Sequence, residues 1–379
     1  MALPSKYCSL KLNQQFFTFY ENQASSCCKS YSEVLDKTKP LKFLQNKWSH
    51  ELQLLEQGVE VENCKLCWQH ESRGQVSFRM SHGQSNTGPE FILSFSNLCN
   101  HMCSYCTPKY SSRWENDIIK NGNYQNISAT ASKNLTLPKQ QQIDVDYWVD
   151  QLNDYFAMHD PGSIKLMLQG GEPLMQVNNI KRLLEFNLDK IKKFLIVTNL
   201  NPPNNKFLFW ILENFPREKL EFTVSLDSSP EYMHIPRAGF DQCLFDQNIK
   251  LLQDYKIPFG FNSVISVVGI FDLKNFFCYL HSTGAKTNFT QLSSPDCLNP
   301  IYLPPEFKEK IKQTVNITEM PEIFQKILDS NSQNQLKLFE QYNYLDQYFY
   351  RAGIDPVNNS NELFAEYWLW LMNFAKNKL

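Results

Sequence analysis

Short apolar runs alternate with longer amphipathic segments along the chain from about residue 90 onward. The apolar runs are rich in Ile, Val, Phe and Leu, and they predict six strands at residues 91–95, 164–169, 193–199, 221–227, 259–267 and 287–292. Because apolar residues fill consecutive positions in these runs, we expect strands that are buried on both faces of a sheet.

Apolar positions at helical spacing occupy the segments between these runs. They predict helices over residues 144–159, 179–191, 203–215, 245–255 and 273–284. Alternation of strands and helices indicates βαβ crossovers and a parallel sheet. Six such units predict an α/β fold of the partial (β/α)6 type, similar to an incomplete TIM barrel, with its chemistry at the carboxyl ends of the strands.

The two ends of the chain have different patterns. Residues 1–88 are polar, loop-rich and dense in cysteine, whereas the chain after residue 300 turns helical and ends in an aromatic-rich segment. We therefore predict three domains: a cysteine-rich N-terminal region (1–88), the barrel (89–299) and a helical C-terminal extension (300–379). The aromatic stripe of the last helix is expected to pack against the barrel. Residues 108–142 are predicted to form a long polar connection that either covers the site or is mobile.

Charge and hydropathy exclude several classes of partner. The formal net charge is −2, with 37 Lys and Arg against 39 Asp and Glu, so the chain is not a polycation suited to nucleic acid or an anionic membrane. The N-terminal run lacks the basic start and apolar core of a signal peptide. No apolar run approaches the roughly 18 residues of a membrane span. We expect a cytoplasmic protein with neither nucleic acid nor membrane as partner.

Cysteine is abundant and unevenly placed. Eight of the eleven cysteines lie between Cys8 and Cys106, and clusters of this kind in a cytosolic chain indicate metal or redox chemistry. Cys99, Cys103 and Cys106 follow the first predicted strand with the spacing C-x3-C-x2-C. A closed site uses four protein ligands, and no fourth Cys or His occupies a matching local position. A [4Fe–4S] cluster on these thiolates would therefore leave one iron open to an exogenous ligand.

A second motif, Leu168-Gln-Gly-Gly-Glu-Pro-Leu174, ends the next predicted strand. Paired glycines, Gly170 and Gly171, let the backbone approach a ligand closely. The carboxylate of Glu172 complements an ammonium group. The structural alternative is a strand-to-helix turn that is capped by an acid.

Together the two motifs resemble the radical S-adenosylmethionine (radical SAM) superfamily. Its signature is C-x3-C-x2-C after the first strand of a partial barrel, with an aromatic residue before the last cysteine, here Tyr105, and a GGEP motif on the following strand. The resemblance implies that Cys99, Cys103 and Cys106 hold a [4Fe–4S] cluster that binds SAM. It further implies reductive cleavage to a 5′-deoxyadenosyl radical, hydrogen abstraction from a substrate, and an electron donor such as flavodoxin or ferredoxin.

Three further residues match the family more weakly. Asn199 and Ser225 stand where relatives place polar contacts to the ribose and the methionine carboxylate of SAM. Arg237 resembles the basic residue that pairs with that carboxylate. A turn Asn, a buried Ser and a surface Arg are the structural alternatives.

The N-terminal cysteines form a second set. Its members are Cys8, Cys27, Cys28, Cys64 and Cys67, followed by Trp68, Glu71, Gly74, Ser77 and Arg79. This order resembles a radical SAM subgroup with auxiliary cysteines of the twitch or SPASM kind, and implies an auxiliary [4Fe–4S] cluster with Cys27 or Cys28 left over. Structural zinc and free buried thiols are the alternatives. In typical members these cysteines follow the barrel, whereas here none lies after residue 300. Three other cysteines are not expected to be ligands: Cys243, Cys278 and Cys297.

The sequence thus predicts a radical SAM enzyme, and a peptide is the expected substrate because many relatives with auxiliary cysteines act on peptides. The alternative substrate is a small metabolite such as a sugar or nucleotide derivative. A non-catalytic protein that binds zinc or another metal is the alternative of a different class.

Overall fold

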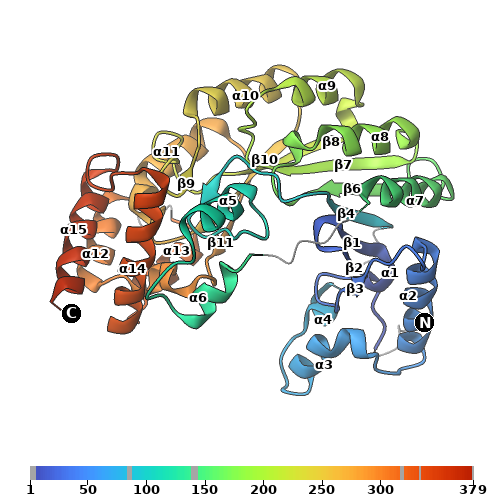
Figure 1. Ribbon diagram of the computed structural model, residues 1–379, viewed down its shortest axis with the longest axis horizontal. Helices are drawn as coiled ribbons and strands as arrows, with labels where there is room; N and C mark the ends of the chain where they lie inside the picture. Colours follow the sequence, from blue (N-terminus) through green and yellow to red (C-terminus); the bar gives the residue numbers. More distant parts are fainter. Residues whose placement is uncertain (1–5, 83–87, 138–143, 316–319, 333, 378–379) are drawn as a thin grey trace. The chain divides into compact units, whose positions relative to one another are not determined.

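A computed structural model of the chain describes residues 6–82, 88–137, 144–315, 320–332 and 334–377. The chain divides into two compact units. The first comprises residues 1–97, 139–197 and 205–221, and the second comprises residues 98–138, 198–204 and 222–379. Figure 1 labels the helices and strands of both.

The first unit contains a sheet with the strand order β7-β6-β4-β1-β2-β3 (Figure 1). Three of the predicted strands run parallel in it, namely β4 (Glu90–Ser94), β6 (Ile164–Leu168) and β7 (Ile191–Thr198). Phe91 and Leu93 of β4 are completely buried, and Ile92 between them is 4% exposed. This strand is therefore covered on both faces, as its unbroken apolar run predicts.

The N-terminal region adds three further strands to this sheet. β1 (Gln14–Thr18) pairs in parallel with β4, and β2 (Gln23–Ser25) and β3 (Glu33–Val34) follow in antiparallel order. The expectation that this region is loop-rich is therefore wrong. Gln15 is buried beside Phe17, and a polar residue at a buried position hides the alternation of β1 from a sequence pattern.

Seven helices are described in the first unit. They are α1 (Leu10–Asn13), α2 (Leu41–Glu56), α3 (Lys65–Glu71), α4 (Phe78–His82), α7 (Val145–Ala157), α8 (Val177–Asn187) and α9 (Lys206–Asn214). α7 begins where the Asp144 side chain accepts a hydrogen bond from the Tyr147 N–H at 3.0 Å, which satisfies one free donor of the first turn. α7 and α8 pack against each other.

The second unit contains the last three predicted strands, β8 (Leu220–Ser225), β10 (Phe259–Ile265) and β11 (Thr287–Gln291), all parallel in the order β8-β10-β11. α10 (Gln242–Asp254) and α11 (Leu273–Thr283) connect them. With the strands of the first unit, these elements confirm the predicted α/β fold built from parallel strands and crossover helices.

Single 3-10 turns join several elements of the described chain. They are η1 (Phe19–Glu21), η2 (Glu62–Cys64), η3 (Pro173–Met175), η4 (Arg217–Lys219), η5 (Ile270–Asp272), η6 (Asp296–Leu298) and η7 (Pro300–Tyr302).

The polar stretch 108–142 contains two helices that the sequence pattern did not indicate, α5 (Ser112–Asn121) and α6 (Ala129–Asn134). Each starts at a serine whose hydroxyl accepts a hydrogen bond from a first-turn N–H, Ser111 for α5 and Ser128 for α6. The polar connection therefore contains two helices in its described part, and residues 138–143 lie outside it. That the connection covers the site or is mobile stays a prediction.

The predicted helical C-terminal extension is confirmed. It consists of α12 (Pro305–Thr314), α13 (Glu322–Asp329), α14 (Gln335–Ala352) and α15 (Glu362–Lys376), which lie together in Figure 1. Phe364 and Trp368 of the aromatic stripe pack edge-on against Phe349 of α14, and Phe364 also contacts Phe271. The stripe thus serves packing. Within the described ranges, no helix has the length and apolar character that a membrane crossing requires.

Candidate active site

The predicted cluster-binding loop, Cys99–Cys106, lies in the second unit and is fixed by a short antiparallel ribbon. β5 (Met102–Cys103) pairs with β9 (Arg237–Ala238), so that Cys103 and Arg237 stand opposite each other. The Cys106 N–H donates to the Cys103 carbonyl at 2.9 Å, which turns the chain between the last two cysteines. The ribbon therefore sets the position of Cys103 and the turn sets that of Cys106.

The carbonyl groups of this loop are bound by side chains from two helices. From α5 and its N-cap, the donors are Ser112 Oγ to the Cys99 carbonyl (3.2 Å), Arg113 Nη1 to Asn100 (3.0 Å), Ser111 Oγ to His101 (2.7 Å) and Trp114 Nε1 to Cys103 (2.8 Å). From α14, they are Tyr348 to Met102 and Tyr344 to Ser104, both at 2.8 Å. Six consecutive carbonyls are thus held in place, which fixes the directions of the cysteine side chains.

Gly239 makes room for one of these donors. Its φ is +98°, and a Cβ there would lie 1.8 Å from Arg113 Nη1 and 2.7 Å from the Asn100 carbonyl oxygen. Arg113 Nη1 also donates to the Ala238 carbonyl at 3.0 Å. Only glycine allows the guanidinium to bridge the ribbon and the loop at this point.

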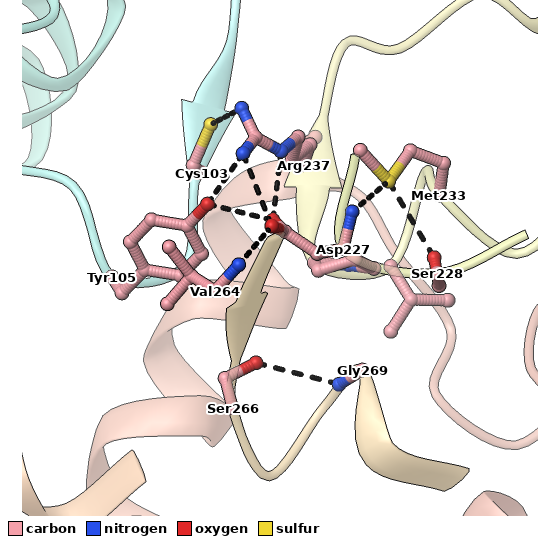
Figure 2. A network of polar contacts seen from close by, with 12 residues as sticks. Cys103, Tyr105, Asp227, Ser228, Met233, Arg237, Val264, Ser266 and Gly269 are labelled. Carbon is pink, nitrogen blue, oxygen red and sulfur yellow. Dashed lines mark hydrogen bonds and ion pairs between the residues drawn. The ribbon is translucent and has the colours of Figure 1, made fainter. Parts of the chain in front are cut away.

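A buried ion pair lies beside Cys103 (Figure 2). Arg237 Nε and Nη2 donate to the two carboxylate oxygens of Asp227 at 2.8 and 3.2 Å, and Nη1 donates to Cys103 Sγ at 3.6 Å. The Tyr105 hydroxyl donates to Asp227 at 2.6 Å and accepts from Arg237 Nη2 at 2.6 Å. The Val264 N–H donates to the same carboxylate at 2.8 Å.

The pKa values of the cysteine thiols and of Arg237 are shifted by burial and by the neighbouring charges. Burial raises the pKa of the Cys103 and Cys106 thiols, that of Cys106 to about 12. Burial opposes the charge on Arg237, but Asp227 raises the pKa of the guanidinium well above its usual value. Binding of a metal would therefore have to displace the thiol protons, and the neighbouring cation favours the thiolate that results.

The structure places the other predicted contacts of the second unit as follows. Asn199 Nδ2 lies 4.0 Å from Cys99 Sγ and donates to Asn100 Oδ1 at 3.1 Å, so Asn199 is part of the loop's surroundings. Ser225 ends β8, half-buried, in register with Asn262 of β10. Tyr105 and Arg237 meet at Asp227, a residue that the sequence reasoning missed. Its only signal was an acidic residue at the end of the strand predicted over residues 221–227.

Buried His101, which lies within the loop, is held as a neutral imidazole. Burial lowers its pKa to about 3, and its Nε2 lies 3.2 Å from Asn201 Oδ1. Asn201 also accepts the Asp241 N–H and donates to the Asp241 carbonyl. His101 therefore links the loop to the start of α10.

The Gly170-Gly171-Glu172 motif belongs to the first unit. Both glycines have positive φ, +81° and +55°, and a Cβ on Gly170 would lie 2.6 Å from Ser94 Oγ. Gln176 Nε2 donates to the Gly170 carbonyl at 3.0 Å and to the Ser96 carbonyl at 3.2 Å. The turn after β6 is thereby joined to the chain that leaves β4.

Glu172 is completely buried, and its Oε1 accepts the Leu174 N–H at 2.9 Å. This contact is the capped turn that the sequence offers as the structural alternative. The role of Glu172 toward an ammonium group, and its proximity to the cysteine loop, stay predictions.

Four of the five N-terminal cysteines line one small cavity in the first unit. Cys8, Cys27, Cys64 and Cys67 share this cavity of about 20 Å³ with Lys11 and Arg79. Cys28 is exposed and is not among the lining residues. Burial raises the pKa of Cys8 to about 11 and that of Cys64 to about 12, whereas a hydrogen bond with Cys28 lowers that of Cys27 to about 7.

The residues that follow Cys67 form a brace beside this cavity. Arg79 Nη2 and Nε donate to the Glu71 carboxylate at 2.6 and 3.1 Å, and Ser77 Oγ donates to Glu71 at 2.5 Å. Arg79 also lies over the Trp68 ring and donates to the Tyr7 carbonyl. The pattern Trp68, Glu71, Ser77 and Arg79 thus connects α3 and α4 to the chain that precedes Cys8.

The surroundings of the core thiols suit an iron–sulfur cluster. Over the described ranges, no three His, Cys, Asp or Glu side chains converge on one point as a single metal ion would need. In an iron–sulfur cluster each thiolate binds a different iron, so the ligands lie farther apart. N–H donors aimed at sulfur, such as Arg237 at Cys103 and Asn199 at Cys99, suit thiolates that carry such a cluster.

Residues 93–273 match the family described as the radical SAM superfamily. A radical SAM domain therefore occupies this segment, which contains both the cysteine motif and the glycine motif. The match names no subgroup, so the twitch or SPASM resemblance stays a prediction. A curated relative, the uncharacterized protein MJ0907 of Methanocaldococcus jannaschii, is 24% identical over 225 residues, which are 58% of this chain and 67% of the relative.

Solved structures similar to this chain include native anSMEcpe with bound AdoMet, at 17% identity and a TM-score of 0.41. That similarity covers 69% of this chain and 61% of anSMEcpe. Another is Streptococcus suis SuiB bound to the precursor peptide SuiA, at 13% identity and a TM-score of 0.38, over 89% of this chain and 70% of SuiB.

Proposed function

We propose that the protein cleaves S-adenosylmethionine reductively at a [4Fe–4S] cluster held by Cys99, Cys103 and Cys106, within its radical SAM domain. The observation that carries the proposal is the loop itself. Three thiols stand on a backbone whose six carbonyls are fixed by α5 and α14. When bound, the cluster and SAM would supply a 5′-deoxyadenosyl radical that abstracts hydrogen from the substrate.

The chain's own residues would bind, orient and shield these groups. The three thiolates would ligate three irons and leave the fourth to SAM. Gly170 and Gly171 would let the backbone approach the methionyl amino group, and Glu172 would complement its charge. Asn199, whose Nδ2 lies 4.0 Å from Cys99 Sγ, would contact SAM near the open iron.

Loss of one ligand tests the core proposal. The purified protein is reconstituted anaerobically with iron and sulfide, then given SAM and dithionite, and 5′-deoxyadenosine is measured. We expect product from the native chain and none from Cys103→Ala, because two thiolates cannot hold a cluster with one open iron. Cys278→Ala is the matched control, since Cys278 is an exposed cysteine on α11. A native protein that binds iron and yet releases no 5′-deoxyadenosine would refute the proposal.

We propose a peptide as substrate, supported by the character of one sheet face in the second unit. Phe289 of β11 packs against Phe277 and Phe324, so α11 and α13 cover its side of the sheet. Asn288 and Thr290 alternate with Phe289 and are exposed, and Asn288 donates to Asn262 of β10 at 3.0 Å. Uncharged amides and hydroxyls on this face suit the amide groups of a peptide.

A small metabolite is the alternative substrate. A library of short synthetic peptides, incubated with the reconstituted enzyme and SAM, would separate the two when peptide masses are followed. A change in mass that depends on SAM supports the peptide. Radical formation with no modified peptide, together with turnover of a sugar or nucleotide derivative, would favour the metabolite.

We further propose an auxiliary [4Fe–4S] cluster on Cys8, Cys27, Cys64 and Cys67, with Cys28 excluded. Support comes from the cavity that these four side chains share and from the exposure of Cys28. Tetrahedral zinc would need all four sulfurs about 2.3 Å from one ion, and among the described residues no group of three Cys, His, Asp or Glu side chains is arranged to hold a single metal ion. Lys11 and Arg79 are both buried at the cavity, and their charges, although paired with Glu51 and Glu71, would favour thiolates there.

Metal content tests this cluster. Two clusters correspond to about eight irons per chain and one to about four. We expect Cys64→Ala to lose about half of the iron and Cys28→Ala to keep all of it. Zinc in place of iron at this site, or an equal loss in both variants, would contradict the assignment. Electrons are expected from a flavodoxin or ferredoxin, which can be tested by replacing dithionite with either protein.

A further inference from the structure

The ion pair between Asp227 and Arg237 has no part in the ligation proposed above, although it lies directly beside Cys103 (Figure 2). The Asp227 side chain is completely buried and that of Arg237 is 8% exposed. A buried pair of this kind is costly to desolvate, and it persists when its geometry and additional hydrogen bonds compensate. The contacts of Asp227 and Arg237 show how the pair is compensated and where the guanidinium points.

Four donors fix the Asp227 carboxylate. They are Arg237 Nε and Nη2, the Tyr105 hydroxyl and the Val264 N–H, all within 3.2 Å. Asp227 lies two residues after the end of β8 and Val264 lies within β10, so the carboxylate is anchored to two neighbouring strands. The anion cannot turn away without breaking backbone contacts to the sheet.

The carboxylate in turn orients the guanidinium. Two of the three nitrogens of Arg237 are engaged with Asp227, and this leaves Nη1 directed at Cys103 Sγ at 3.6 Å. The planar fork of arginine fixes the third nitrogen once the other two are bound. Pairing of Cys103 with Arg237 across the β5–β9 ribbon holds the two backbones at the matching distance.

We propose that Asp227 is a positioning residue that holds Arg237 as a hydrogen-bond donor to the Cys103 thiolate and thereby raises the reduction potential of the cluster. The inference rests on the proposed function, since it needs a cluster on Cys103. Hydrogen bonds and positive charge at a ligand sulfur stabilise the reduced, more negative cluster. Arg237 would then act on the cluster, in place of the contact with the methionine carboxylate that the family resemblance implies.

The midpoint potential of the reconstituted holoenzyme tests this inference. Reductive titration is followed by electron paramagnetic resonance, and the core cluster is recognised because its spectrum changes when SAM is added. At the midpoint potential of the native protein, we expect Asp227→Glu, which keeps the carboxylate charge but moves it by one methylene, and Arg237→Lys to lower the ratio of reduced to oxidised cluster about tenfold, a shift of about 59 mV for one electron. Lysine keeps the charge but has no second nitrogen for Cys103.

Ser266→Ala is the matched control. Ser266 lies in the same neighbourhood (Figure 2), where it accepts the Gly269 N–H, and has no contact with the ion pair drawn there. Its midpoint potential is expected to equal that of the native protein. Tyr105→Phe provides a milder test if the variants at Asp227 and Arg237 fail to assemble the cluster. It removes one donor from Asp227 and keeps both charges, so a smaller shift in the same direction is expected.

Two results would overturn the inference. One is an unchanged midpoint potential in every variant that assembles the SAM-responsive cluster. The other is weaker SAM binding at an unchanged potential, which would assign Arg237 to SAM instead of Cys103. Absence of any SAM-responsive cluster from the native protein would refute the proposed function itself, and the two failures are thereby distinguishable.

Discussion

Tyr348 offers a direct test of how the C-terminal extension supports the cysteine loop. Its hydroxyl donates to the Met102 carbonyl at 2.8 Å and accepts the Ala238 N–H at 3.2 Å, so it joins both strands of the β5–β9 ribbon. Tyr348→Phe deletes this hydroxyl and leaves two buried backbone groups without that partner. Each such group costs about 1 to 3 kcal/mol, so a local loss of at least about 2 kcal/mol is expected.

Hydrogen–deuterium exchange of the ribbon measures this loss. A change of about 2 kcal/mol in the opening free energy accelerates amide exchange roughly 30-fold, since each 1.4 kcal/mol is a factor of ten. Peptides that cover Met102 and Ala238 should therefore exchange faster in Tyr348→Phe. Tyr350→Phe is the control on the same helix, because Tyr350 is 87% exposed. Equal exchange in both variants would refute the view that α14 secures the loop.

Three further predictions follow from other contacts. Gly239→Ala should displace Arg113 from the Asn100 carbonyl and lower cluster occupancy, which is measured as iron per chain. Gly284→Ala is the control for backbone strain alone, because Gly284 has a φ of +62° and no atom lies within 4 Å of the added Cβ. Glu71→Ala should destabilise the first unit by about 3 to 5 kcal/mol, because buried Arg79 loses its bidentate partner; unfolding in urea measures this, and an unchanged midpoint would contradict it. Burial raises the pKa of the Cys297 thiol to about 12 in the folded protein, so as pH rises the thiol of the unfolded chain loses its proton before that of the folded chain. The midpoint temperature of thermal unfolding should therefore fall as pH rises from about 9 toward 12. A similar fall in Cys297→Ala would show that other groups cause it.

The strands of the fold could be predicted because their signal is local. Continuous apolar runs such as Phe91–Leu93 indicate burial on both faces, and the observed strands begin and end within two residues of the predicted limits. β1 was missed because buried Gln15 interrupts its pattern, and its partner β4 lies more than seventy residues away along the chain. Strand pairing over such a sequence separation cannot be predicted from the hydrophobic pattern of a short segment.

The candidate site was predictable only in part, for a similar reason. The spacing of Cys99, Cys103 and Cys106 predicts three ligands, since ligand type and spacing are properties of the sequence. Asp227 and Tyr348 carry no such signature, because what they contribute depends on contacts across more than a hundred residues. Ser111 could have been found, since a serine ahead of a helical pattern is a known start signal.

The strand that the N-terminal region adds to the sheet has a consequence for removing that region. β1 covers the edge of β4 along five paired positions, from Glu90 to Ser94. A chain shortened to start at β4 would expose the hydrogen-bonding groups of a strand whose centre, Phe91 to Leu93, is apolar, and such an edge recruits other chains into intermolecular sheets. Aggregation of the shortened protein would thus reflect an uncovered strand edge and would say nothing about the loss of a metal.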